Sequence, residues 1–238
     1  MEPQKPRLIS GIPVKPSKKT ARGNRGCADV HGKPVDYRST LERDLLFLLD
    51  IDPTVAEVVA QPVTFRYRRP GTGRMADYTP DFHVRHVGAD PREILYQVKH
   101  RADLCEAYRE HKGGWMVARR EAREHGMTHR IITDKEIRGP FLANAWILKR
   151  FKRIDPDEGL EERLAATLAT LGPSTPAALL AATFWSRDNQ AKAIPHMWRM
   201  VAHGRILADL RAPLTMSSPI TIILGEGGYG WTDPYSSR

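Results

Sequence analysis

Four side chains suited to phosphodiester chemistry stand at positions that a folded chain can bring together. Asp81 opens one strand-like run, and Gln97 and Lys99 end the next one. If these two runs pair around the turn at residues 88–91, Asp81 and Lys99 lie side by side, because paired strands place opposed residues next to each other. Glu42, upstream in a helical stretch, offers a second carboxylate. The pattern predicts a nuclease active site.

Carboxylates are needed for such chemistry because they hold divalent cations, which activate water and neutralise the charge that develops on the phosphate. Mg²⁺ prefers oxygen ligands and keeps several waters, so one or two carboxylates suffice. We expect two Mg²⁺ ions, with Mn²⁺ as a substitute. Asp81 is the predicted bridging ligand, Glu42 the second acid, and the side chain or backbone carbonyl of Gln97 a further oxygen. Lys99 is predicted to orient water or to oppose phosphate charge.

Each of these residues also has an explanation without catalysis. Asp81 follows a proline and could cap a turn, and Lys99 could be a solvent-exposed residue at a strand end. Ser39 is a good helix N-cap with Glu42 at the third helical position, which is the spacing of a capping box. Glu42 also falls within the apolar arc of its helix, which favours a metal site, and the two roles are compatible.

Composition restricts the class of protein. The 238 residues carry a formal net charge of +9 and a pI near 9.7, which suit a polyanionic partner such as DNA. Cys27 and Cys105 lie far apart without further ligands at metal-binding spacing, which argues against a zinc knuckle or a secreted disulfide scaffold. No apolar run reaches transmembrane length, and no apolar signal core begins the chain. We expect a cytoplasmic protein with no membrane partner.

The chain is predicted to hold two domains between an arm and a tail. Residues 1–35 form a basic, flexible arm, which either is only solvated or contacts DNA. The residues of the arm predicted to bind DNA are Lys15, Lys18, Lys19, Arg22 and Arg25. Residues 36–155 form the catalytic α/β domain. Its predicted elements are a helix from residue 39, strands at 58–68, around Asp81, before Lys99 and at 130–133, and helical stretches at 103–111, 115–125 and around 141–148.

Composition changes after Pro156, where alanine and leucine become dominant. Ser174 or Thr175 is expected to cap a helix that has Pro176 in its first turn. Another helical stretch follows at 188–203, interrupted by Pro195. Two strands after it would complete the helix and hairpin order of a winged helix over residues 156–224, followed by a flexible tail at 225–238.

The acid after a proline, followed by Gln97-Val98-Lys99 on the next strand, resembles the restriction-endonuclease-like superfamily, with glutamine where that superfamily usually has an acid. Within it, the chain is similar to TnsA, the endonuclease subunit of heteromeric cut-and-paste transposases. The segments that carry the likeness are Ser39-Thr40-Leu41-Glu42-Arg43-Asp44, Gln61-Pro62, Tyr78-Thr79-Pro80-Asp81-Phe82, Gln97-Val98-Lys99, Ile131-Ile132-Thr133-Asp134 and Glu136-Ile137-Arg138. The fold implied is a restriction-endonuclease-like mixed-sheet α/β core followed by a small, mainly helical winged-helix-like domain.

The resemblance implies a protein that cuts double-stranded DNA at the 5′ ends of a transposon. A separate DDE-type transposase subunit would process the 3′ ends, and the C-terminal region would contact an AAA+ regulator. Glu42, Asp81, Gln97 and Lys99 then inherit the catalytic positions of the family, and the assembled protein would be associated with the nucleoid. Two alternatives stay open: a stand-alone nuclease of the same superfamily in repair or phage defence, and a non-catalytic DNA-binding assembly factor.

Overall fold

The computed structural model describes residues 25–69, 71–88 and 90–222. Within these ranges the chain divides into two compact units. Unit 1 comprises residues 25–43 and 55–135, and unit 2 comprises residues 44–54 and 136–222. The helices of the described ranges include none that is long and apolar enough to cross a lipid bilayer. The tail predicted for residues 225–238 and most of the predicted arm lie outside the described residues.

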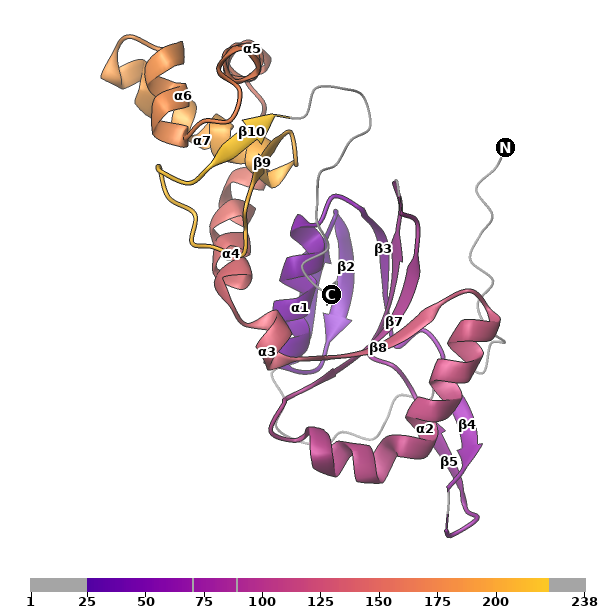
Figure 1. Ribbon diagram of the computed structural model, residues 1–238. Helices are drawn as coiled ribbons and strands as arrows, with labels where there is room; N and C mark the ends of the chain where they lie inside the picture. Colours follow the sequence, from indigo (N-terminus) through magenta and orange to yellow (C-terminus); the bar gives the residue numbers. More distant parts are fainter. Residues whose placement is uncertain (1–24, 70, 89, 223–238) are drawn as a thin grey trace, which may run out of the picture. The chain divides into compact units, whose positions relative to one another are not determined.

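A four-stranded mixed sheet with the order β3-β6-β7-β8 forms the centre of unit 1 (Figure 1). The strands are β3 (Val55–Ala60), β6 (Phe82–His86), β7 (Glu93–Lys99) and β8 (Thr128–Thr133). β3, β6 and β7 pair antiparallel, whereas β8 runs parallel to β7. β7 has a strand on each side, and its residues from Ile94 to Val98 are buried. The predicted mixed α/β core is confirmed.

A separate hairpin leaves this sheet between β3 and β6. It consists of β4 (Phe65–Arg68) and β5 (Met75–Tyr78), which pair antiparallel. The prediction of one strand over residues 58–68 is therefore wrong. Strand β3 ends at Ala60, because Gln61 has a positive φ of 50° and Pro62 has no N–H to continue the hydrogen-bond ladder.

Helix α2 (Leu104–Glu124) connects the parallel strands β7 and β8, which a short turn could not join. It is one continuous helix, although its two central glycines suggested two helical stretches. The glycine at 114 is needed for packing: a Cβ there would lie 2.6 Å from Tyr78 Cβ. The hairpin and α2 share a buried apolar cluster, and Figure 1 shows them side by side. Its buried members are Phe65, Tyr67, Tyr78, Leu95, Trp115, Ala118 and Ala122.

Residues 26–37, mostly assigned to the flexible arm from the sequence, form a hairpin instead. Strands β1 (Gly26–Val30) and β2 (Lys33–Tyr37) pair through a two-residue turn in which His31 and Gly32 both have positive φ. Alternating burial of Ala28, Val30 and Val35 gives the hairpin an apolar face, which the basic composition around it concealed. Helix α1 (Thr40–Ile51) follows and contributes residues to both units.

Unit 2 is mainly helical. Its elements after the short helix α3 (Asp134–Ile137) are α4 (Pro140–Lys152), α5 (Glu158–Leu171), α6 (Pro176–Thr183), α7 (Arg187–Ala202), β9 (Ile206–Ala208) and β10 (Ile220–Ile222). β9 and β10 pair antiparallel. Thr175 caps α6 by accepting a bond from Ala178 N, as predicted. Pro195 lies inside α7 without interrupting it, which corrects the predicted break.

A buried carboxylate links the helices of unit 2 to its hairpin. Glu161 on α5 is only 2% exposed and accepts bonds from Arg199 on α7 at 2.7 Å and from Arg205 at 2.8 Å. Because both oxygens meet a guanidinium, the charge of Glu161 is compensated although it is buried. Arg199, one of the basic residues of α7, is therefore already paired with a carboxylate inside unit 2.

We predict that Gly114→Ala destabilises the protein by about 1–3 kcal/mol, because the added methyl group overlaps Tyr78 and forces the hairpin away from α2. Gly159→Ala on α5 is the matched control. Its Cβ would approach Asp157 Oδ1 only to 3.7 Å, so alanine should stabilise by roughly 0.5–1 kcal/mol through helix propensity. Urea unfolding measures both. Equal stability of Gly114→Ala and the wild type would contradict the packing described.

Candidate active site

Asp81 lies beside the end of β7, immediately before β6 begins. Its backbone N–H donates to Tyr96 O at 2.9 Å, and its side-chain Oδ2 accepts from Val98 N at 2.6 Å. The antiparallel pairing of β6 with β7 therefore brings Asp81 to the strand that ends with Gln97 and Lys99. The predicted pairing is confirmed, and Lys99 is near enough for its charge to act on Asp81.

The Gln97 amide is fixed between two partners. Its Nε2 donates a short hydrogen bond to Asp81 Oδ2, and its Oε1 accepts from the Tyr78 hydroxyl at 2.7 Å. The same hydroxyl lies 2.9 Å from His129 Nε2. Because a phenol has one proton and gives it to Gln97 here, His129 Nε2 must be the donor to Tyr78. A chain of buried hydrogen bonds thus runs from His129 through Tyr78 and Gln97 to Asp81.

Glu42 combines a capping role with a place near Asp81. Ser39 Oγ accepts from Glu42 N and donates to Glu42 Oε1, both at 3.1 Å, and Glu42 Oε2 accepts from Arg38 N at 2.7 Å. Ser39 therefore caps the helix as predicted, whereas Glu42 reaches back to the N–H of Arg38 rather than to that of Ser39, one residue before the position a capping box uses. The charge of Glu42 also acts on Asp81, so the same carboxylate belongs to the acidic pair.

Two acids held close together change the protonation of the buried one. Burial and then the negative charge of Glu42 raise the pKa of Asp81 from 3.8 to about 7. The Val98 N–H and the charges of Lys99 and Arg38 counteract part of this increase. Both bonds to Asp81 use Oδ2, so Oδ1 meets no donor among the described residues.

The outer members of the hydrogen-bond chain are neutral near pH 7. Burial, helped by the charge of Arg119, lowers the pKa of His129 from 6.5 to about 4. Burial raises the pKa of Tyr78 well above its ordinary value, and the charge of Asp81 adds to this effect. Neutral groups can hold an amide in place without bringing a further charge to the acidic pair.

Sequence reasoning missed three residues of this site: Arg38, Tyr78 and His129. Arg38 donates a short hydrogen bond to Gln61 Oε1, and Gln61 N donates to Asp81 O at 2.8 Å. Arg38 stands directly before the predicted helix cap Ser39, and this position could have indicated that it lies near Glu42. No comparable signal pointed to His129, because it lies 51 residues from its partner Tyr78.

Two further observations concern ligands and DNA. The described ranges contain no group of three or more His, Cys, Asp and Glu side chains arranged to hold a metal ion. The candidate site instead offers two acids and an amide. Of the five residues predicted to bind DNA, Arg25 is exposed before β1, and the other four lie outside the described residues.

We predict that His129→Gln changes how stability depends on pH. The folded-state pKa near 4 lies below 6.5, so unfolding takes up a proton between these values, and the contribution of His129 to stability rises with pH over that window. The raised pKa of Asp81 acts oppositely, its contribution falling as pH rises from 3.8 to about 7. The contribution of His129 is therefore obtained as the difference in the free energy of unfolding between the wild type and the variant, in which the contribution of Asp81 cancels.

The free energy of unfolding of the wild type relative to the variant should rise by at most about 3 kcal/mol between pH 4.5 and pH 6.5 and stay level above that. Glutamine keeps an amide donor for Tyr78 but does not titrate. Urea unfolding at several pH values provides the measurement. A constant difference would show that His129 is not held neutral by burial.

Comparison with known proteins bears on the same region. Residues 52–134 match the family model described as TnsA-like endonuclease N terminal. The match spans β3 to β8 and includes Asp81, Gln97 and Lys99, whereas Glu42 precedes it. No curated protein matches the chain. Residues 52–134, with the strand ends that carry Asp81, Gln97 and Lys99, are therefore similar to the N-terminal domain of TnsA-like endonucleases.

Proposed function

We propose that this protein is the metal-dependent DNA endonuclease subunit of a heteromeric transposase and cleaves the 5′ ends of a transposon. The observation that carries the proposal is the convergence of Asp81, Glu42, Gln97 and Lys99 within unit 1. The match of residues 52–134 to a TnsA-like endonuclease domain supports the same reading. The 5′ cleavage and the division of labour with a DDE-type subunit rest on the family resemblance.

The chemistry of the site fits a divalent cation. Burial and then the negative charge of Glu42 raise the pKa of Asp81, and a bound divalent cation would counteract both by favouring the charged carboxylate. Asp81 Oδ1 and Glu42 are the oxygens that would hold Mg²⁺ or Mn²⁺. A site with only two acids suits Mg²⁺, which keeps several of its waters. When bound, the metal would supply Lewis-acid stabilisation and a more acidic water.

Gln97 would take part through a rearranged amide or through the neighbouring backbone. Its Oε1 faces Tyr78, since the reverse orientation would oppose an oxygen to the Asp81 carboxylate. The amide can turn if Tyr78 donates to His129 instead, which requires only the other tautomer of a neutral ring. The Val98 carbonyl, 3.4 Å from Gln97 Nε2, is a further oxygen on this side of β7.

The remaining side chains would bind and orient the scissile phosphate. Lys99 is the last residue of β7 and supplies a positive charge that can oppose the phosphate or orient the attacking water. Arg38 is exposed and held by Gln61, so its guanidinium is placed beside the acidic pair without being buried. A planar guanidinium suits a phosphate because two N–H groups can bind two oxygens at once.

Unit 2 is proposed to act in assembly as a winged-helix-like module that contacts an AAA+ regulator or the DDE-type subunit. The order α5, α6, α7, β9, β10 supports the winged-helix assignment. Met197 and Trp198 are buried, whereas the side chain of Trp185 is fully exposed, at 102%. A tryptophan left in solvent suits a protein partner, because large aromatic side chains supply much of the binding free energy at interfaces.

We predict that Asp81→Ala abolishes strand cleavage and that Lys99→Ala and Glu42→Ala reduce it on the order of 100-fold, while the fold persists. Glu42→Gln separates the two roles of Glu42, since glutamine still accepts from the Arg38 N–H but removes the charge. The assay is cleavage of transposon-end duplex in Mg²⁺ or Mn²⁺ with the partner transposase present. Asp103→Asn, an exposed N-cap without a side-chain bond, is the control and should cut normally.

Undiminished cutting by the Asp81 variant would refute the assignment of the site. Normal cutting by Glu42→Gln with loss only in Glu42→Ala would reduce Glu42 to a capping residue. Calorimetry with Mn²⁺ alone gives an independent readout, in which the wild type should bind and Asp81→Ala should not.

We predict that Trp185→Ala weakens capture of the AAA+ regulator or of the DDE-type subunit by at least tenfold, equivalent to about 1.4 kcal/mol or more. Met116→Ala in unit 1 removes another exposed apolar side chain, 62% exposed, and serves as the control. Affinity measured by surface plasmon resonance with purified partners tests the prediction. Equal binding by Trp185→Ala to both partners would contradict an assembly role for this residue.

A further inference from the structure

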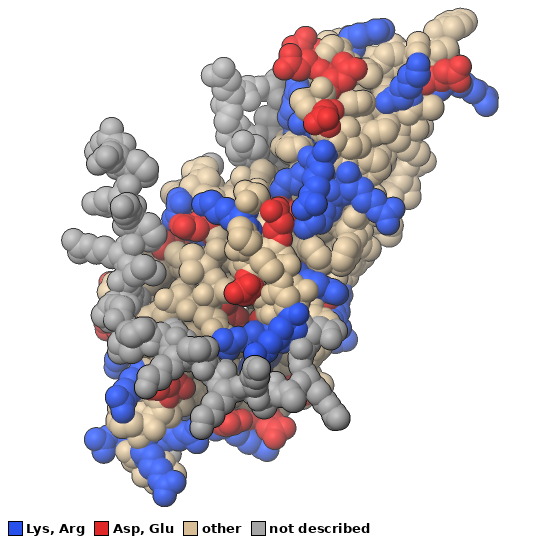
Figure 2. Space-filling model, turned by 180° about the vertical axis from the view of Figure 1, so that it is seen from behind, with Lys and Arg blue, Asp and Glu red and all other residues tan. Residues whose placement is uncertain are grey.

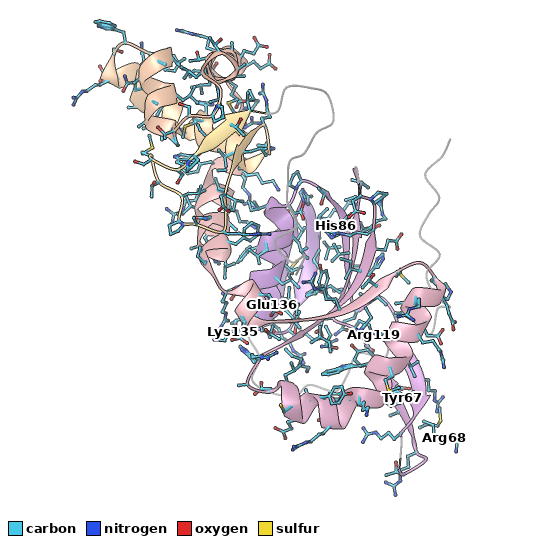
Figure 3. The ribbon with its side chains drawn as sticks, in the orientation of Figure 1. Tyr67, Arg68, His86, Arg119, Lys135 and Glu136 are labelled. Atoms are coloured by element: carbon cyan, nitrogen blue, oxygen red, sulfur yellow. The ribbon has the colours of Figure 1, made fainter. Side chains whose placement is uncertain are left out.

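The β4–β5 hairpin has one apolar face and one strongly basic face. Phe65 and Tyr67 are buried in the cluster shared with α2, whereas the alternating residues Arg66 and Arg68 are exposed. Figure 3 shows Tyr67 and Arg68 as neighbours on β4, with Arg68 at the outer side. Because α2 occupies the apolar side, the opposite side of the ribbon is available to a partner.

Four arginines gather on this free side and at the tip. Arg69 and Arg74 flank the turn, and both are exposed. The carboxylate of the hairpin is Asp77, which lies opposite Arg66 in the register. Within the part of the chain that the structure describes, no ion pair engages any of these four guanidinium groups. Figure 2 shows Lys and Arg side chains at the lower left, where this part of unit 1 lies in the reversed view.

Arginine is a specific choice for such a surface. Its guanidinium is planar, stays charged and matches the two oxygens of a phosphate, whereas lysine offers a point charge. A two-stranded ribbon is also narrow enough to enter the major groove of DNA. Ordinary solvation of a hairpin needs no excess of one charge, and interspersed signs serve solubility better. The excess of arginine on this face therefore indicates that it binds a polyanion rather than facing only solvent.

The base of the hairpin belongs to the candidate active site. β5 ends at Tyr78, whose hydroxyl binds Gln97, and Asp81 follows three residues later. A bond of 2.7 Å between the hydroxyls of Thr64 and Thr79 closes the base of the ribbon. From Tyr78 to Arg74 the strand extends about 14 Å, at about 3.4 Å per residue. The tip thus reaches about four base pairs from the site, since duplex DNA rises about 3.4 Å per base pair.

From these observations we propose that the outer face of the β4–β5 hairpin binds the sugar-phosphate backbone of the duplex flanking the cleavage position. The inference rests on the proposed nuclease function for the position of the cut, but binding itself requires neither metal nor cleavage. Arg66, Arg68, Arg69 and Arg74 are the contacting residues, and the pairing of β4 with β5 and the packing of the hairpin against α2 hold them in place.

The test measures how the affinity for a fluorescein-labelled duplex of arbitrary sequence depends on salt, in EDTA, from about 50 to about 200 mM salt. The triple variant Arg68→Gln, Arg69→Gln, Arg74→Gln is compared with the full-length wild type. Each lost phosphate contact should lower the slope of log affinity against log salt by about 0.9, so the triple variant should lose about 2.7. Its affinity should fall by roughly tenfold or more.

The matched control removes the same charge from α2, through Arg109→Gln, Lys112→Gln and Arg123→Gln, all at exposed positions. A second variant replaces Arg68, Arg69 and Arg74 by lysine, which keeps the charge and should keep most of the slope. Urea midpoints should match the wild type, because the substituted side chains are exposed.

An unchanged slope in the triple glutamine variant, or an equal loss in the α2 control, would overturn the proposal. Loss of binding to an RNA duplex or to a protein partner with an unchanged DNA slope would overturn it as well. Calorimetry with Mn²⁺ separates this proposal from the nuclease assignment. The triple variant should bind Mn²⁺ as the wild type does, whereas loss of metal binding would point to damage at the site and count against the hairpin as a DNA contact.

Discussion

The partly buried Asp81 carboxylate, placed beside Glu42, is the constraint around which unit 1 is organised. A buried anion next to a second anion costs free energy unless hydrogen bonds, a proton or a cation compensate it. The Val98 N–H and the Gln97 amide provide two bonds to Oδ2, and both depend on the register of β6 against β7. Burial and the charge of Glu42 still raise the pKa of Asp81, because these bonds offset them only in part. The remaining part is what a divalent cation would supply.

Glutamine at position 97 fits this constraint better than a third acid would. An amide can donate to Asp81 and accept from Tyr78 at once, whereas a carboxylate would add repulsion. The neighbouring left-handed Gln61 is held by its bonds to Asp81 and Arg38, so local backbone strain is located at the site. The same residue turns the chain out of β3 and into the hairpin.

Local patterns made much of this fold and site predictable. The Ser39 cap, the alternation along β6 and β7, and the Thr175 cap depend on residues close in sequence. Contacts between distant residues were not predictable from one sequence, and His129, 51 residues from Tyr78, is the clearest case. Local propensity also gave wrong answers where packing prevails, as at Gly114 and Pro195, whose helices continue because one face of each is buried.

The central claim is that Asp81 and Glu42 together hold a divalent cation. The most direct measurement is a crystal structure of the full chain grown with Mn²⁺, with anomalous scattering used to locate the metal. The account predicts a peak bound to Asp81 Oδ1 and a Glu42 oxygen, at distances close to 2.1 Å for an octahedral hard cation, which is about the Mg²⁺ value. A saturating Mn²⁺ concentration that leaves this pair without a peak, or places the metal on other side chains, would contradict it.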